Sequence, residues 1–326
     1  MLAGLCLLAV TFALWIVPTD QYIYLPDPAH PVAPLVEAQG GSDPADGGGI
    51  YFVDVVYRKA TLLERLLGGL HEGADLRSHE QVVPHGQSAE EQRRADLADM
   101  RLSQRIAAAV ALRSLGRTVT ATPVGARISM VGPGTPAQGR LSAADVIVAV
   151  DGERVRSPED VTERMRDHRV GDTVRFTVRR AGKPRTVEVE TVAAPDEPGR
   201  AIVGILLSQA TDIRLPIRVS IDAGNVGGPS AGLAFALGLM EKLGRDVDRG
   251  LKVAATGQLY LNGEVGPIGA VKQKTIGARR AGVDVFLVPA GDNAREARRY
   301  ADGLRIVPVK NFQQALQKLA TLGETA

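Results

Sequence analysis

Cysteine is almost absent from this chain, because Cys6 is the only one among 326 residues. A single thiol excludes a disulfide within the chain and excludes zinc sites built on paired cysteines. An oxidising compartment is therefore permitted but not required. An excess of charge of either sign is also missing. The formal net charge is +2, so bulk electrostatics give no reason to expect nucleic acid as a partner.

Two motifs of common enzyme classes are missing as well. The chain has no Gly-x₄-Gly-Lys-Ser/Thr phosphate loop, the usual sign of an ATPase module. Every histidine lies before residue 201, so the C-terminal block offers no histidine base for a serine nucleophile. Three histidines fall close together, but their spacings place no pair on one helical face: His71, His79 and His85. We therefore expect no metal and no cofactor.

Charge is absent from one N-terminal stretch, Leu2–Val17. Its length is just under the ~20 apolar residues that usually cross a bilayer, so it is either a signal peptide or a membrane anchor. No Ala-x-Ala site follows closely, and aromatic residues such as Trp15 and Tyr22 suit a membrane interface, which favours an anchor over residues 1–17. The first basic residue is Arg58, which predicts that most of the chain lies outside the cytoplasm.

The next two segments differ in composition. Residues 18–48 are rich in proline and then in glycine, which predicts a linker. Residues 49–118 begin with the strand candidate "GIYFVDVVY" and end with a helix through "LADMRLSQRIAAAVALRSLG". Capping-box spacing, Ser88 with Glu91, stands before this helix. The strand and the helix are candidates for membership in the catalytic domain, with the following block inserted between them and the rest.

A compact block of strands and turns covers residues 119–193. It combines a Gly-x-Pro-Ala turn, a strand start and an Asp-Gly turn, carried by Gly134, Pro136, Ala137, Asp145, Asp151 and Gly152. With these features the block resembles a PDZ domain, although Ala144 stands where a glycine is usual. The resemblance implies a groove that takes an extended peptide as an added strand. Ile128 and Met130 are our candidates to line it.

Ser230 lies in the stretch "NVGGPSAGLAFALGLM", in which glycines and a proline precede an apolar helical run. A helix N-terminus leaves backbone N–H groups unpaired, and these groups stabilise a developing oxyanion. Ser230 is therefore either a helix cap or a nucleophile. The N–H groups near Gly228 to Ala231 are candidates for an oxyanion hole.

A lysine replaces histidine as a base when burial lowers its pKa toward neutrality. "GPIGAVKQKTIGARRAG" places Lys272 and Lys274 at the start of a helix, after an apolar turn. The positive end of the helix dipole also disfavours an ammonium ion there. The alternative is that both lysines are ordinary solvated charges.

Three stretches together are similar to the proteolytic domain of Lon-type serine peptidases: "GGPSAGLAFALGLMEKL", "TGQLYLNGEVGPIGAVKQKTIGARRAG" and "VFLVP". The resemblance covers residues 201–323, and we expect the proteolytic domain to span residues 200–326. It implies that Ser230 is the nucleophile and Lys274 the general base, and that Thr256 helps to orient them. Many Lon-type enzymes carry aspartate three residues before the serine, where this chain has Gly227. Classical Lon enzymes also carry an ATPase module.

The combination looks like the membrane-anchored, ATP-independent PDZ–Lon-type proteases of bacteria. The expected fold class is α+β, a Lon-type proteolytic domain with a PDZ-like domain, behind an N-terminal transmembrane segment. The expected activity is cleavage of unfolded or extended polypeptides at the outer side of the bacterial cell membrane, with a single-pass anchor, and family analogy implies a homo-oligomer. The alternative is a catalytically silent PDZ-containing binding or scaffold protein. A phosphate site at the helix terminus is a third reading.

Overall fold

The structure is a computed structural model and describes residues 12, 14–43, 47–68, 71–82 and 88–323. The described chain divides into two compact units. The first contains the described residues up to Val82, together with Met100–Thr118 and everything from Leu215 onward. The second contains the described residues between Val82 and Met100, together with Val119–Arg214. Each unit is treated separately below.

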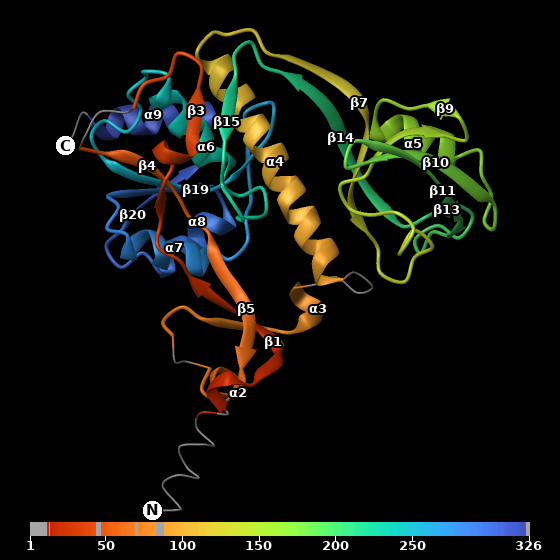
Figure 1. The fold of residues 1–326 in the computed structure, drawn as a ribbon, viewed down its shortest axis with the longest axis horizontal. Helices are drawn as coiled ribbons and strands as arrows, with labels where there is room; N and C mark the ends of the chain where they lie inside the picture. Colours follow the sequence, from red (N-terminus) through yellow and green to blue (C-terminus); the bar gives the residue numbers. More distant parts are fainter. Residues whose placement is uncertain (1–11, 13, 44–46, 69–70, 83–87, 324–326) are drawn as a thin grey trace, which may run out of the picture. The chain divides into compact units, whose positions relative to one another are not determined.

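A five-stranded sheet in the order β2-β4-β16-β19-β20 forms the centre of the first unit (Figure 1). Four strands run parallel, and only the two-residue β2 is antiparallel to its neighbour. The strands are β2 (His30–Pro31), β4 (Gly49–Phe52), β16 (Lys252–Ala255), β19 (Val285–Pro289) and β20 (Arg305–Val309). "GIYFVDVVY" therefore supplies a central neighbour of β16, although about 200 residues separate the two in sequence.

Helices cover both faces of this sheet, so alternate residues of each strand enter two different cores. Val253, Ala255, Val285 and Leu287 pack with one set of helices, whereas Ala254, Phe286 and Val288 pack with the other. The first set is α4 (Ala89–Ser114), α6 (Gly232–Lys242) and α9 (Phe312–Gly323), and the second is α7 (Val271–Arg280) and α8 (Asp292–Arg299) (Figure 1). Burial on both faces explains why these strands read as continuous apolar runs. This unit is thus α/β, whereas α+β was expected.

Within the segment expected to be a linker, residues 18–48, the described residues form strands and a short helix instead. Its first part is β1 (Pro18–Pro26), which lies between β5 (Val55–Thr61) and β6 (Asp75–Arg77) in a three-stranded sheet. Its second part contains η1 (Ala33–Leu35) and β3 (Val36–Ala38), and Val32 and Val36 are buried in the main core. The prediction of a linker from composition is wrong here, because apolar residues between the prolines pack into the core.

Short elements complete the first unit. They are α2 (Leu62–Leu66), α3 (His79–Val82), β15 (Val219–Ile221), β17 (Gln258–Leu259) and β18 (Val265–Gly266). A capping box begins α2, with Thr61 and Glu64 as its partners. Ser88 and Glu91 form the same reciprocal pair before α4, as their spacing predicts.

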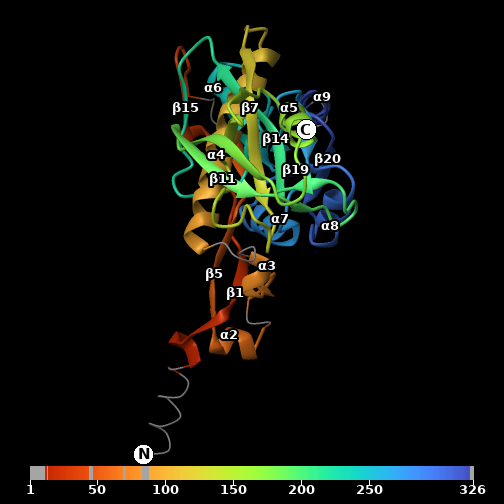
Figure 2. The same ribbon diagram turned by 90° about the vertical axis from the view of Figure 1, so that its right-hand side faces the viewer.

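The second unit is an antiparallel sheet in the order β11-β10-β8-β7-β14, of which Figure 2 labels β11, β7 and β14. Its elements are β7 (Thr120–Val131), β8 (Val146–Val150), β9 (Glu153–Arg154), α5 (Pro158–Met165), β10 (Thr173–Arg180), β11 (Lys183–Glu190), β12 (Val192–Ala193), β13 (Ala201–Ile202) and β14 (Ile205–Arg214). Strand β14 was expected in the proteolytic domain. It pairs instead with β7 from Ile205↔Val131 to Arg214↔Thr120, so that the backbone of β14 is paired along its whole length.

The apolar stretch Leu2–Val17 lies mostly outside the described residues. Phe12, Trp15 and Ile16, which the structure does describe, expose their side chains. Among the described helices, none is long and apolar enough to span a membrane.

Candidate active site

Ser230 lies in a tight turn that leads into α6, two residues before the first helical residue Gly232. Gly228 has a φ of +83°, a conformation that glycine adopts without strain. The side chain of Ser103, on α4, donates a hydrogen bond to the Pro229 carbonyl at 3.0 Å. A Cβ atom on Gly232 would lie 2.8 Å from the Ser103 Oγ atom. The glycine therefore allows α4 to approach and support the turn that carries Ser230.

Lys274 lies in the first turn of α7, and its side chain ends at Ser230. The Lys274 Nζ atom is 2.5 Å from the Ser230 Oγ atom. The lysine side chain is only 4% exposed, whereas Ser230 is half-buried. The two residues predicted as a pair, 44 positions apart, are therefore in hydrogen-bond contact, and the serine hydroxyl remains partly accessible to a substrate.

Burial lowers the pKa of Lys274 from 10.5 to about 8, and the negative charge of Asp54 opposes this effect. Removal of an ammonium group from water is costly, so the folded chain favours the neutral amine. At pH 8 about half of the molecules then hold Lys274 as a free base, which accepts a proton from a neighbouring hydroxyl.

Thr256 is fully buried and contacts both members of the pair. Its hydroxyl donates to the Ser230 carbonyl at 3.1 Å, and the Lys274 Nζ atom lies 3.4 Å from the Thr256 Oγ1 atom. The backbone N–H of Gly257 also donates to the Ser230 carbonyl, at 2.8 Å. Thr256 thus fixes the positions of the serine backbone and the lysine amine.

Lys272, the other lysine of the Lys-x-Lys pair, points elsewhere. Its Nζ atom donates to the Asp75 carboxylate at 2.5 Å and to the Ala74 carbonyl at 3.2 Å. Gln273 donates to the same carboxylate at 2.8 Å. These contacts attach β6 to α7, so Lys272 has a structural role and Lys274 alone faces the serine.

Comparison with protein families assigns both parts of the chain. The PDZ domain family matches residues 92–191, and the Lon protease (S16) C-terminal proteolytic domain matches residues 204–321. The chain contains a PDZ domain and a Lon-type proteolytic domain. The second match begins at β14, which the structure places in the sheet of the PDZ unit.

The Lon-type domain accounts for the similarity to curated proteins. Lon protease 1 of Sorangium cellulosum is 37% identical over 109 residues, which cover 30% of this chain and 13% of that protein. Lon protease of Helicobacter pylori (strain J99) is 40% identical over 97 residues, 28% of this chain and 11% of that protein. The chain therefore spans under a fifth of the length of these relatives.

A solved structure matches the PDZ part. The PDZ domain of the SdrC-like protein from Listeria innocua is 26% identical, and the match covers 26% of this chain and 96% of that chain, with a TM-score of 0.25.

The N–H groups proposed for an oxyanion hole lie around the serine of the Lon-type domain. Gly228 and Ala231 flank Ser230 on the turn before α6. Within the part of the chain that the structure describes, the N–H groups of Gly228, Ser230 and Ala231 donate to no carbonyl. These groups are therefore available to a substrate oxygen.

The predicted lining of the PDZ groove, Ile128 and Met130, needs correction. Both residues lie on β7, which has β8 on one edge and β14 on the other. Ile128 is fully buried in the core of the PDZ unit, whereas Met130 is 43% exposed. Strand β14 pairs with β7 along its whole length, and β8 pairs with β7 at Ala126 and Arg127. The outermost strand on this side of the described sheet is β14.

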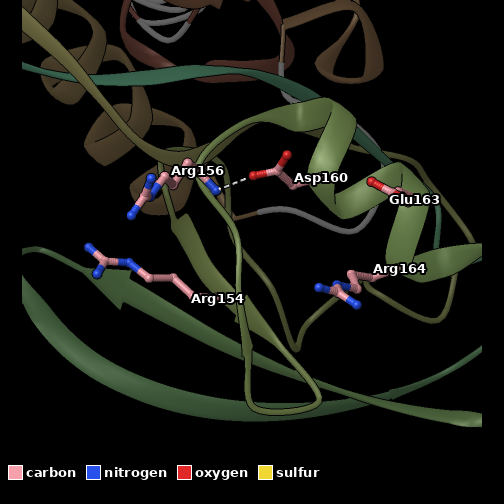
Figure 3. A pocket seen from close by; sticks show the side chains of 5 residues that line it. All are labelled: Arg154, Arg156, Asp160, Glu163 and Arg164. Atoms are coloured by element: carbon pink, nitrogen blue, oxygen red, sulfur yellow. Dashed lines mark hydrogen bonds between the residues drawn. The ribbon is translucent and has the colours of Figure 1, made fainter.

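The PDZ unit also contains a charged cavity of about 320 Å³, shown in Figure 3. It lies between β9 and α5, and charged side chains line it: Arg154, Arg156, Asp160, Glu163 and Arg164. The Arg156 backbone N–H donates to the Asp160 carboxylate at 2.6 Å (Figure 3). This cavity contains neither member of the Ser230–Lys274 pair.

Sequence reasoning missed a group of side chains beside Lys274. Asp27, His30 and Asp54 place their polar atoms within 4.8 Å of one another. Glu241, Asp246 and Asp248 form a second such group, but Glu241 already accepts the N–H groups of Val247 and Asp248. The aspartate of "GIYFVDVVY" was the available signal for the first group, because it follows a strand of the catalytic unit.

Proposed function

We propose that this protein is a serine endopeptidase with a Ser230–Lys274 dyad. The observation that carries the proposal is the 2.5 Å contact between the Ser230 hydroxyl and a buried amine whose pKa is about 8. A serine needs an adjacent base to act as a nucleophile, and a desolvated lysine serves as one. The match to the Lon-type proteolytic domain supports the same reaction class.

The reaction begins when neutral Lys274 accepts the proton of the Ser230 hydroxyl as the oxygen attacks a peptide carbonyl. The carbonyl oxygen becomes an oxyanion, which the N–H groups around Gly228 and Ala231 stabilise. Lys274, now an ammonium, gives its proton to the leaving amine, and an acyl-enzyme remains. Water, deprotonated by Lys274, then releases the acid and regenerates the hydroxyl.

The proposed substrates are unfolded or extended polypeptides, cleaved without ATP. The sequence contains no phosphate-loop motif, which is the usual sign of an ATPase module that would unfold a folded substrate. Strand β14 ends the strand order of the described PDZ sheet, which supports a role for the PDZ domain in selecting or gating substrates, because an extended peptide adds to a sheet edge as a further strand.

Action outside the cytoplasm, from a single-pass anchor in a bacterial membrane, is part of the proposal. Exposed apolar side chains just before β1 support it, namely Phe12, Trp15, Ile16 and Val17. Removal of the residues before Pro18 should move the protein from the membrane fraction to the soluble fraction. A homo-oligomer remains a prediction, to be checked by light scattering of the purified protein.

The decisive experiment is cleavage of unfolded casein by wild type, Ser230→Ala, Lys274→Ala and Lys272→Ala, with and without ATP. We expect cleavage to fall by at least about a thousandfold in the first two variants and to persist in Lys272→Ala. Removal of residual ATP with apyrase should leave the rate of casein cleavage unchanged. Failure of the wild type to cleave would favour the catalytically silent binding protein, for which Gly227 is the sequence argument. Retained activity in both dyad variants would reject Ser230 and Lys274 as the catalytic pair.

A further inference from the structure

Asp54 carries an unusual carboxylate beside the dyad. Its Oδ1 atom is buried and accepts no hydrogen bond within the described residues. The His30 Nε2 atom lies 3.7 Å from this oxygen and 3.0 Å from the Asp27 Oδ2 atom. A buried carboxylate oxygen without a hydrogen bond is costly, so its position calls for a compensating interaction.

The sheet explains how Asp54 comes to the catalytic lysine. Strands β4 and β16 are parallel neighbours, with Phe52 opposite Ala255. The chain continues from β16 into Thr256, which contacts Lys274, and it continues from β4 through Val53 into Asp54. The carboxyl ends of parallel strands meet at one edge of a sheet, so Asp54 and Thr256 lie on the same edge, next to the lysine.

Helix α7 is also held against the group that surrounds Asp54. A Cβ atom on Gly277 would lie 1.9 Å from the carbonyl oxygen of Asp27, so α7 and this backbone are in direct contact. Gly277 lies three residues after Lys274, on a neighbouring part of the same helix face. The helix that carries the base and the segment that carries Asp27 and His30 are therefore packed as one piece.

The other basic residues of α7 pair with carboxylates other than Asp54. On α7, Lys272 pairs with Asp75, and both Arg279 and Arg280 pair with Glu72. Burial and Asp27 raise the pKa of the Asp54 carboxyl, whereas the nearby charges of His30 and Lys274 oppose this rise. Within the described chain, Asp54 is the charged group that acts on the Lys274 amine.

We propose that Asp54 is a positioning residue for Lys274, and that its carboxylate, which lies beside His30, stabilises the lysine ammonium as it forms during acyl transfer. This inference rests on the proposed function. The proton moves from the Ser230 oxygen to the Lys274 nitrogen and then to the leaving amine, and Asp54 remains an anion throughout. Asp54 thus supplies charge without accepting the proton.

Asp54→Asn should change the pH dependence of cleavage, not only its rate. Without the carboxylate, the lysine becomes a weaker base, so the acid limb of kcat/KM should move down by about one pH unit. The plateau at high pH should fall about tenfold, because the ammonium loses its counter-charge. The loss should therefore be large at pH 9.5 and small at pH 6.5. Asp75→Asn, which changes the contacts of Lys272 and Gln273 and leaves Asp54 in place, is the matched control and should keep the wild-type profile.

A second measurement needs no activity. In a Ser230→Ala background with ¹³C-labelled lysine, the Lys274 signal is identified by its absence in Lys274→Met and titrated by NMR. Asp54→Asn should lower its midpoint by about one pH unit. An unchanged midpoint, or an equal loss of activity at every pH, would overturn the role of Asp54. Absence of cleavage by the wild type would instead reject the peptidase, and the NMR midpoint would still decide for or against Asp54.

Discussion

Replacement of Lys274 by methionine should make the protein more stable at neutral pH, although it removes the proposed base. The pKa of Lys274 is about 8 in the folded chain and 10.5 in the absence of burial. Folding therefore releases a proton between pH 8 and 10.5, and the free energy of unfolding rises with pH across this window. Below pH 8 the buried ammonium costs roughly 3 kcal/mol. Methionine has a similar length and carries no charge, so it avoids this cost.

Urea unfolding followed by circular dichroism measures the effect, in a Ser230→Ala background that prevents self-cleavage. We expect Lys274→Met to raise the free energy of unfolding by about 2–3 kcal/mol at pH 7 and by nearly nothing at pH 10.5. Lys272→Met is the control, and it should lose stability because Asp75 loses its partner. A Lys274→Met variant that is less stable at pH 7, or a gain that does not change with pH, would refute the claim that burial holds the amine neutral.

Three further predictions concern the same site. Because the base must be neutral, kcat/KM for peptide cleavage should rise with pH and reach half its plateau near the pKa of Lys274, about 8; a profile flat from pH 6 to 9 would contradict this. Gly277→Ala should destabilise the protein by about 2–3 kcal/mol in thermal melts and abolish cleavage, because the added methyl overlaps the Asp27 carbonyl; a melt like that of wild type would show that the helix contact is looser. Ser103→Ala should cost about 1 kcal/mol and lower kcat more than it raises KM, since the turn at Pro229 loses its hydrogen bond; unchanged kinetics would remove α4 from the support of the nucleophile.

The dyad was within reach of the sequence because its signals are local. Glycines and a proline before Ser230, and an apolar turn before Lys274, describe each half of the site over a few residues. The assignment of Lys274 rather than Lys272 came from resemblance to a family, and the structure gives its physical counterpart in the Lys272–Asp75 pair. The alternation of apolar strands and helices likewise predicted the elements of the C-terminal block.

Pairing between distant segments was not within reach. Asp54 joins the site only because β4 lies beside β16, and no local pattern fixes that neighbour. The sequence predicts two separate strands here, Ala201–Ser208 and Ile213–Asp222, whereas the structure has the single strand β14, whose place in the PDZ sheet depends on a long register with β7. The prolines and glycines around Val32 predict a linker, because composition does not show that a few apolar residues between them enter the core.

The position of β4 has a consequence for synthesis of the protein. The ribosome makes this strand early, but its partner β16 emerges only about 200 residues later, which takes roughly 10–40 seconds. During translation the nascent chain therefore lacks the sheet that brings Thr256 and Asp54 to the lysine. The contact between Ser230 and Lys274 therefore forms only after most of the chain has been synthesised.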